Sequence, residues 1–173
     1  MIHFKERLRK VKAFAFDVDG VLSNPKVYLL PGGEMVRSMN TKDGYALQHA
    51  ARRGYPIAII TGATTESVGE RFRRLGITDI HLGASYKMDC FTEFVRKYGI
   101  EMKDVLYMGD DLPDLEVMQA SGVPCCPSDA VDEIKALSLY VSPLPGGEGC
   151  ARDVIEQVLR LHGHWMDGDA FTW

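Results

Sequence analysis

Two carboxylates stand at the end of a short apolar run near the start of the chain. Asp17 and Asp19, followed by Gly20, come directly after residues 11–16, a run that is too short for an ordinary helix and reads as a buried strand. Two carboxylates this close repel each other unless a cation or a proton lies between them. The sequence therefore places charge at the end of a strand, where open α/β sheets bind their ligands.

Further polar groups follow other apolar runs. Thr61 ends the run 55–60, Asp110, Asp111 and Asp114 follow the run 105–108, and Lys87 begins a helical pattern between them. Because the carboxyl ends of parallel strands meet at one edge of a sheet, we expect these groups to converge.

The converging groups predict a site for Mg²⁺ and phosphate. Mg²⁺ prefers oxygen ligands and takes few of them from the protein, so Asp17 and Asp110 would supply side-chain ligands. Lys87 and the Thr61 hydroxyl would hold phosphoryl oxygens. The sequence argues against a calcium-binding EF-hand loop, since the twelfth position of such a loop counted from Asp17 is Tyr28 rather than an acid.

The elements that must position these groups alternate between strand and helix. This order predicts an α/β fold with a doubly wound, mostly parallel sheet, in one domain spanning 1–173. Two β-prone runs around a Pro-Gly-Gly turn predict a hairpin flap at about 24–40, and we expect no cap domain. The tail at about 163–173 lacks periodicity and is expected to be mobile or docked on a partner. Expected strands are 11–16, 55–60, 77–82, 105–108, 123–126 and 139–141, and expected helices include 87–98, 129–137 and 151–162.

Composition narrows the class of protein. The chain has 173 residues, of which 46% are hydrophobic, a formal net charge of −4 and no block of basic residues, which argues against nucleic-acid binding. No apolar run approaches the roughly 20 residues of a membrane span, and the N-terminus lacks a signal-peptide pattern. The four cysteines show no metal-binding spacing, so we expect buried free thiols and a cytoplasmic location.

The ordered motifs resemble those of a known superfamily. Residues 17–21, Thr61-Gly62, Lys87 and residues 109–114 resemble the four motifs of the haloacid dehalogenase superfamily, in its capless branch. Residues 40–44 and 146–152 look like the corresponding stretches of 3-deoxy-D-manno-octulosonate 8-phosphate phosphatases, which act in lipopolysaccharide sugar synthesis.

The resemblance implies a mechanism and an assembly. Asp17 would attack phosphorus and form an aspartyl-phosphate, and Asp19 would protonate the leaving oxygen and then activate water. Asp19 would contact Mg²⁺ through its backbone carbonyl, while Asp111 and Asp114 would orient metal waters or Lys87. The substrate would be a phosphorylated sugar acid, in a homotetramer whose sites are completed by a neighbouring subunit. The substrate-binding residues implied are Asp19, Asn40, Thr41, Lys42, Asp43, Gly44, Gly62, Arg71, Lys87 and Arg152.

The sequence is compatible with several alternative functions. Ala63 and Gln48 stand where the octulosonate family often has arginine, so a related phosphatase of nine-carbon sugar acids is the first alternative. A receiver-like phospho-switch module and a non-catalytic scaffold are others, although a receiver gains nothing from Asp19. Arg37 in the flap and Arg152 are expected either to reach a neighbour's site or to be solvated surface charges.

Overall fold

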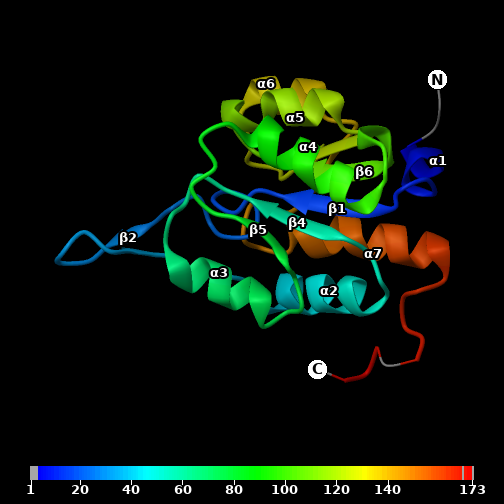
Figure 1. The fold of residues 1–173 in the computed structure, drawn as a ribbon, viewed down its shortest axis with the longest axis horizontal. Helices are drawn as coiled ribbons and strands as arrows, with labels where there is room; N and C mark the ends of the chain where they lie inside the picture. Colours follow the sequence, from blue (N-terminus) through cyan, green and yellow to red (C-terminus); the bar gives the residue numbers. More distant parts are fainter. Residues whose placement is uncertain (1–3, 169, 173) are drawn as a thin grey trace.

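A computed structural model describes residues 4–168 and 170–172. Over these residues the chain forms one six-stranded parallel sheet between two layers of helices, which confirms the predicted α/β class (Figure 1). The strand order is β5-β4-β1-β6-β7-β8, so the chain winds in both directions from the central β1. The strands are β1 Ala13–Phe16, β4 Ile57–Ile60, β5 Asp79–His81, β6 Val105–Met108, β7 Val123–Cys126 and β8 Tyr140–Val141.

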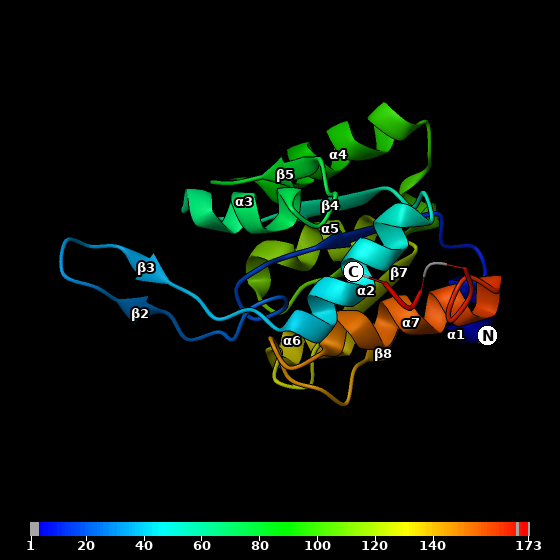
Figure 2. The same ribbon diagram turned by 90° about the horizontal axis from the view of Figure 1, so that it is seen from below.

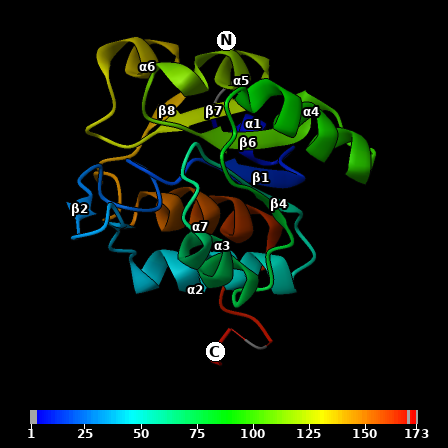
Figure 3. The same cartoon turned by 60° about the vertical axis from the view of Figure 1, so that its left-hand side comes forward.

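The helices divide between the two faces of the sheet (Figure 3). One face is covered by α2 Thr41–Arg52, α3 Glu66–Arg73 and α7 Cys150–His162, and the other by α4 Lys87–Tyr98, α5 Leu115–Ala120 and α6 Asp132–Leu137. Side chains of β1 alternate between these layers. Phe14 and Phe16 pack in the core with α2 and α7, whereas Ala13 and Ala15 leave room for the large side chains of α4 on the opposite face.

Some boundaries differ from the expected ones. The helix expected at 129–137 begins at Asp132, because the Asp129 carboxylate accepts a hydrogen bond from Gly146 N at 2.8 Å within a loop. The short basic helix α1 spans Phe4–Leu8, and 3-10 turns span Met102–Asp104 and Leu112–Asp114. No helix among the described residues has the length and apolar character needed to cross a membrane.

A hairpin of strands β2 Tyr28–Leu29 and β3 Met35–Val36 extends away from the body of the protein (Figure 2). It lies within the range in which the sequence predicts a flap. Its apolar side chains are exposed, and Tyr28 and Leu29 have 68% and 71% of their surface open to solvent.

The described residues of the tail run back along α2 of the same chain. Tyr45 donates its hydroxyl hydrogen to the Ala170 carbonyl, and His49 Nε2 lies 2.9 Å from the His164 carbonyl oxygen. Trp165 meets the rings of Tyr45 and His49 edge-on. This stretch of the tail is thereby placed against its own chain at α2.

Asp43 joins α2 to α7. It is 2% exposed, and its Oδ1 accepts a hydrogen bond from Arg152 N at 2.7 Å in the first turn of α7, where backbone N–H groups lack helical partners. Its Oδ2 has no hydrogen-bond partner among the described residues. Burial raises the pKa of Asp43 from 3.8 to about 6, against the opposing effect of the α7 backbone donors.

This pKa predicts a pH-dependent contribution to stability. Because the pKa is raised on folding, ionisation of Asp43 weakens the folded state as the pH rises from about 4 to 6. We expect the unfolding free energy of the wild type, relative to that of Asp43→Asn, to fall by about 1–3 kcal/mol between pH 4 and pH 7. Urea unfolding of both proteins across this range measures the difference, and a constant difference would contradict the assigned burial of the charge.

Candidate active site

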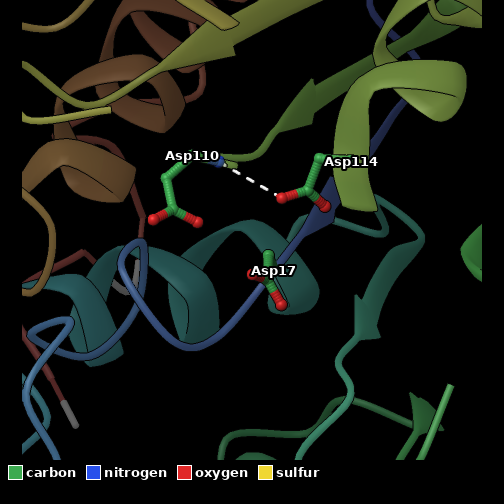
Figure 4. A group of neighbouring side chains, drawn as sticks. All are labelled: Asp17, Asp110 and Asp114. Atoms are coloured by element: carbon green, nitrogen blue, oxygen red, sulfur yellow. Dashed lines mark hydrogen bonds between the residues drawn. The ribbon is translucent and has the colours of Figure 1, made fainter. Parts of the chain in front are cut away.

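Three carboxylates converge at the carboxyl edge of the sheet (Figure 4). Asp17 follows β1, and Asp110 and Asp114 follow the adjacent β6. One oxygen from each carboxylate lies within 4.8 Å of the others. The convergence expected from the strand ends is therefore present, and it includes Asp114 as well as Asp17 and Asp110, the two residues expected to bind metal through their side chains.

Lys87 at the start of α4 is the cation closest to this cluster. Its Nζ lies 3.0 Å from Asp17 Oδ1 and 2.7 Å from Asp114 Oδ1, and the side chain is 6% exposed. Burial alone would lower the pKa of Lys87, but the charges of Asp17 and Asp114 outweigh it and raise that pKa. Lys87 is thus held as a buried cation.

Asp114 is fully engaged by the protein. Besides Lys87, its Oδ1 accepts a hydrogen bond from the Tyr107 hydroxyl at 2.6 Å, and its Oδ2 accepts one from Asp110 N at 3.2 Å. This leaves Asp17 and Asp110 as the carboxylates with oxygens available to an incoming group. Tyr107 was not among the predicted site residues, although a tyrosine within an otherwise apolar buried strand is a signal for such a partner.

The cluster carries more negative charge than Lys87 can balance. Burial, followed by the charge of Asp114, raises the pKa of Asp17 to about 7, although Lys87 opposes this shift. Burial, followed by the charges of Asp17 and Asp114, raises the pKa of Asp110 to about 8. Groups whose ionised forms are disfavoured in this way bind a proton or a cation, so the donor set fits a divalent metal ion.

Gly20 allows the carboxylate of Asp110 to approach the loop that follows β1. Gly20 has a φ of +88°, and a Cβ built there would lie 1.9 Å from Asp110 Oδ2. Any larger residue would have to displace the carboxylate. The close approach of Asp110 thus explains why a glycine directly follows Asp19.

Thr61 and Asp19 lie in the same cavity as the cluster. The cavity has a volume of about 450 Å³, and Thr61 at the end of β4 is buried in its wall, where its Oγ1 accepts a hydrogen bond from Ala63 N at 3.1 Å. The lining residues are Asp17, Asp19, Pro25, Thr61, Gly62, Ala63, Ala84, Ser85, Lys87, Asp110, Asp111, Pro113 and Asp114. All four residues predicted to be catalytic and both acids predicted to be side-chain metal ligands are among them.

Asp19 is paired with an arginine of the hairpin from its own chain. Arg37 Nε and Nη2 donate to the two carboxylate oxygens at 2.6 and 2.9 Å. Asp19 Oδ1 also accepts a hydrogen bond from Ser23 at 3.1 Å. Arg37 is therefore not the solvated surface charge that was one of its two expected roles: within one chain it lies in the site of that chain. This contact depends on how the hairpin folds back and has no local sequence signal.

Most of the residues expected to bind the sugar lie outside this cavity. Asn40 caps α2 by accepting a hydrogen bond from Lys42 N at 2.9 Å, and Gly44 makes room for the guanidinium of Arg71. Thr41 and Lys42 are exposed, and Asp43 binds α7. Of the residues expected to bind the sugar, Asp19, Gly62 and Lys87 line the cavity.

Arg152 faces a different part of the surface. Its guanidinium lies over the rings of Tyr45 and Trp165, 5.6 and 5.2 Å from their centres, and its Nε is 3.3 Å from Glu156 Oε2. Asp111 sits at the cavity rim, and its Oδ1 accepts a hydrogen bond from Leu112 N at 2.8 Å. Within one chain, therefore, the structure brings together the residues predicted to bind phosphate but leaves Arg152 apart.

Comparison with known proteins agrees with this geometry. The family model of haloacid dehalogenase-like hydrolases matches residues 40–122. The 3-deoxy-D-manno-octulosonate 8-phosphate phosphatase KdsC of Salmonella typhi is 33% identical over 161 residues, covering 93% of this chain and 86% of the relative.

Two solved structures of such phosphatases share the fold. The Yersinia pestis protein superposes with a TM-score of 0.90 at 30% identity, covering 93% of this chain and 87% of the other. The Moraxella catarrhalis protein, solved with a magnesium ion, a phosphate ion and KDO, gives a TM-score of 0.87 at 32% identity, covering 91% of both chains. With this identity over most of both sequences and the carboxylate cluster in place, the chain belongs to the 3-deoxy-D-manno-octulosonate 8-phosphate phosphatases, a family of haloacid dehalogenase-like hydrolases.

Proposed function

We propose that this protein hydrolyses 3-deoxy-D-manno-octulosonate 8-phosphate to the free sugar acid and phosphate, with Mg²⁺ as its metal. The observation that carries the proposal is the group formed by Asp17, Asp110 and Lys87 in a cavity that also holds Asp19 and Thr61. The substrate is carried over from the family, whose Moraxella catarrhalis member was solved with KDO and phosphate.

Asp17 and Asp110 would hold the metal with their side chains, and Asp19 would add its backbone carbonyl. When bound, Mg²⁺ supplies positive charge that neutralises the carboxylates and polarises the phosphoryl group. Asp114 does not take part directly, because Lys87, Tyr107 and the Asp110 backbone engage its oxygens. Its role is to hold Lys87 beside Asp17, and Asp111 at the rim would orient metal-bound water.

The side chains of this chain can carry a two-step transfer. An Asp17 carboxylate oxygen attacks phosphorus, the bond to the sugar oxygen breaks, and Asp19 donates a proton to that oxygen. Asp19 then takes a proton from water as the water oxygen attacks phosphorus, which releases phosphate and restores Asp17. Lys87 and the Thr61 hydroxyl hold the phosphoryl oxygens during both steps.

The substrate is tested by steady-state kcat/KM for the eight-carbon and nine-carbon sugar-acid phosphates beside phenyl phosphate. The proposal expects the eight-carbon ester to be preferred over both. Preference for the nine-carbon ester would instead indicate a phosphatase of nine-carbon sugar acids. If neither ester is preferred over phenyl phosphate, the substrate is not a sugar-acid phosphate.

We also propose a cytoplasmic homotetramer in which neighbouring subunits complete each site. The exposed apolar hairpin supports this assembly, as does the position of Arg152 outside the catalytic cavity of the same chain. The free cysteines suit a reducing compartment. Light scattering of the purified protein is expected to give the mass of four chains. A fully active monomer would overturn the shared site.

Metal affinity is expected to rise with pH. Because the pKa values of Asp17 and Asp110 are raised to about 7 and about 8, protons compete with Mg²⁺ at pH 6 and are released when the metal binds. Isothermal titration from pH 6 to pH 9 should show tighter binding and fewer released protons as pH increases. Asp110→Asn should abolish binding, while the exposed control Asp132→Asn should retain it, and pH-independent affinity would contradict the assigned ligands.

Asp17→Asn should abolish catalysis without unfolding the protein. An amide is a poor nucleophile towards phosphorus, so phosphate release should fall at least about 10³-fold. The melting temperature of the metal-free protein should not decrease, because burial and the charge of Asp114 already disfavour the ionised form of Asp17, and an amide carries no charge. Phosphate release and thermal melting are compared with the exposed control Asp89→Asn. Full turnover by Asp17→Asn would rule out the covalent mechanism.

A further inference from the structure

The ion pair between Arg37 and Asp19 occupies the group that proton transfer requires. Both carboxylate oxygens of Asp19 accept hydrogen bonds from Arg37, at 2.6 and 2.9 Å. Asp19 lines the catalytic cavity, where it would meet the leaving oxygen of the substrate. Asp19 must therefore exchange Arg37 for the substrate during turnover.

Arg37 is poorly placed to lose its anion. Its side chain is only 6% exposed, whereas that of Asp19 is 35% exposed. A guanidinium enclosed to this degree is costly to leave without a negative partner. Another anion would have to take the place of Asp19 when Asp19 transfers a proton.

A second cavity, lined by Arg37, adjoins the catalytic cavity. It has a volume of about 310 Å³ and lies under the hairpin, and the two cavities share Asp19, Gly62 and Ala63 in their walls. Ala63, with its small side chain, lines both cavities. Arg37 and Thr65 line the far part, where Arg37 Nη1 donates to the Thr65 hydroxyl at 3.3 Å.

This arrangement fits a substrate with two anionic ends. With phosphate beside Lys87, the leaving oxygen would lie at Asp19, the body of the molecule would pass over Ala63, and its far end would reach Arg37 and Thr65. We propose that Arg37 binds the carboxylate of the substrate, and that this exchange of partners frees Asp19 for proton transfer. The sugar-acid identity of that carboxylate rests on the proposed function, whereas the selection of a second anion rests on the two cavities and the ion pair.

The proposal predicts a selective loss in Arg37→Ala. The measured quantity is the ratio of kcat/KM for the eight-carbon sugar-acid phosphate to kcat/KM for arabinose 5-phosphate, which lacks a carboxylate. We expect this ratio to fall by about 10- to 100-fold, the range for the loss of one hydrogen-bonded contact to a charged group. Most of the loss should appear in KM for the acid. Arg37→Lys should retain part of the preference, because it keeps the charge without the paired donors.

Lys26→Ala is the matched control, since it removes an exposed cation from the same hairpin outside both cavities. Its ratio should equal that of the wild type. If Arg37→Ala lowers kcat/KM equally for both esters, Arg37 has a structural role and the proposal is overturned. An unchanged kcat/KM for both esters would also overturn it.

The two proposals fail in different ways. If the wild type prefers another carboxylated ester and Arg37→Ala removes that preference, the octulosonate assignment is wrong and the role of Arg37 stands. If the wild type prefers the octulosonate ester and Arg37→Ala keeps the preference, the role of Arg37 is wrong. A wild type without any preference for carboxylated esters would overturn both.

Discussion

The site depends on an imbalance of charge at one edge of the sheet. Asp17, Asp110 and Asp114 lie together with Lys87 as the nearest cation, and burial adds to their mutual repulsion. Asp114 is compensated by Lys87, Tyr107 and a backbone donor, so the remaining excess falls on Asp17 and Asp110. The protein thereby fixes Asp114 in place and leaves Asp17 and Asp110 as the carboxylates that we propose bind the metal.

The fold brings these charges together through two neighbouring strands. β1 and β6 pair in parallel, with Phe16 opposite Met108, so the residues after each strand emerge side by side. α4 starts at the same edge and directs Lys87 between Asp17 and Asp114. A strand order that separated β1 from β6 would place the same residues too far apart to share a metal.

Sequence patterns predict the six strands and the convergence of Asp17, Thr61 and Asp110, because three of the apolar runs end in these polar groups and parallel pairing places the strand ends at one edge. Sequence patterns do not predict contacts between residues that lie far apart in the sequence. The pairing of Arg37 with Asp19 depends on the path of the hairpin, and the place of Asp43 depends on how α2 packs against α7. The sugar-binding roles of Arg71 and Arg152 stay predictions, since neither lines the catalytic cavity within one chain.

Direct detection of phosphate on Asp17 tests the account most sharply. Metal-loaded enzyme is mixed with the eight-carbon sugar-acid phosphate, quenched in acid within one turnover, digested, and analysed by mass spectrometry. The account predicts a phosphorylated peptide whose modified residue is Asp17, absent without the metal ion and absent from Asp17→Asn. Release of phosphate with no phosphorylated Asp17 at any time during the turnover would contradict it.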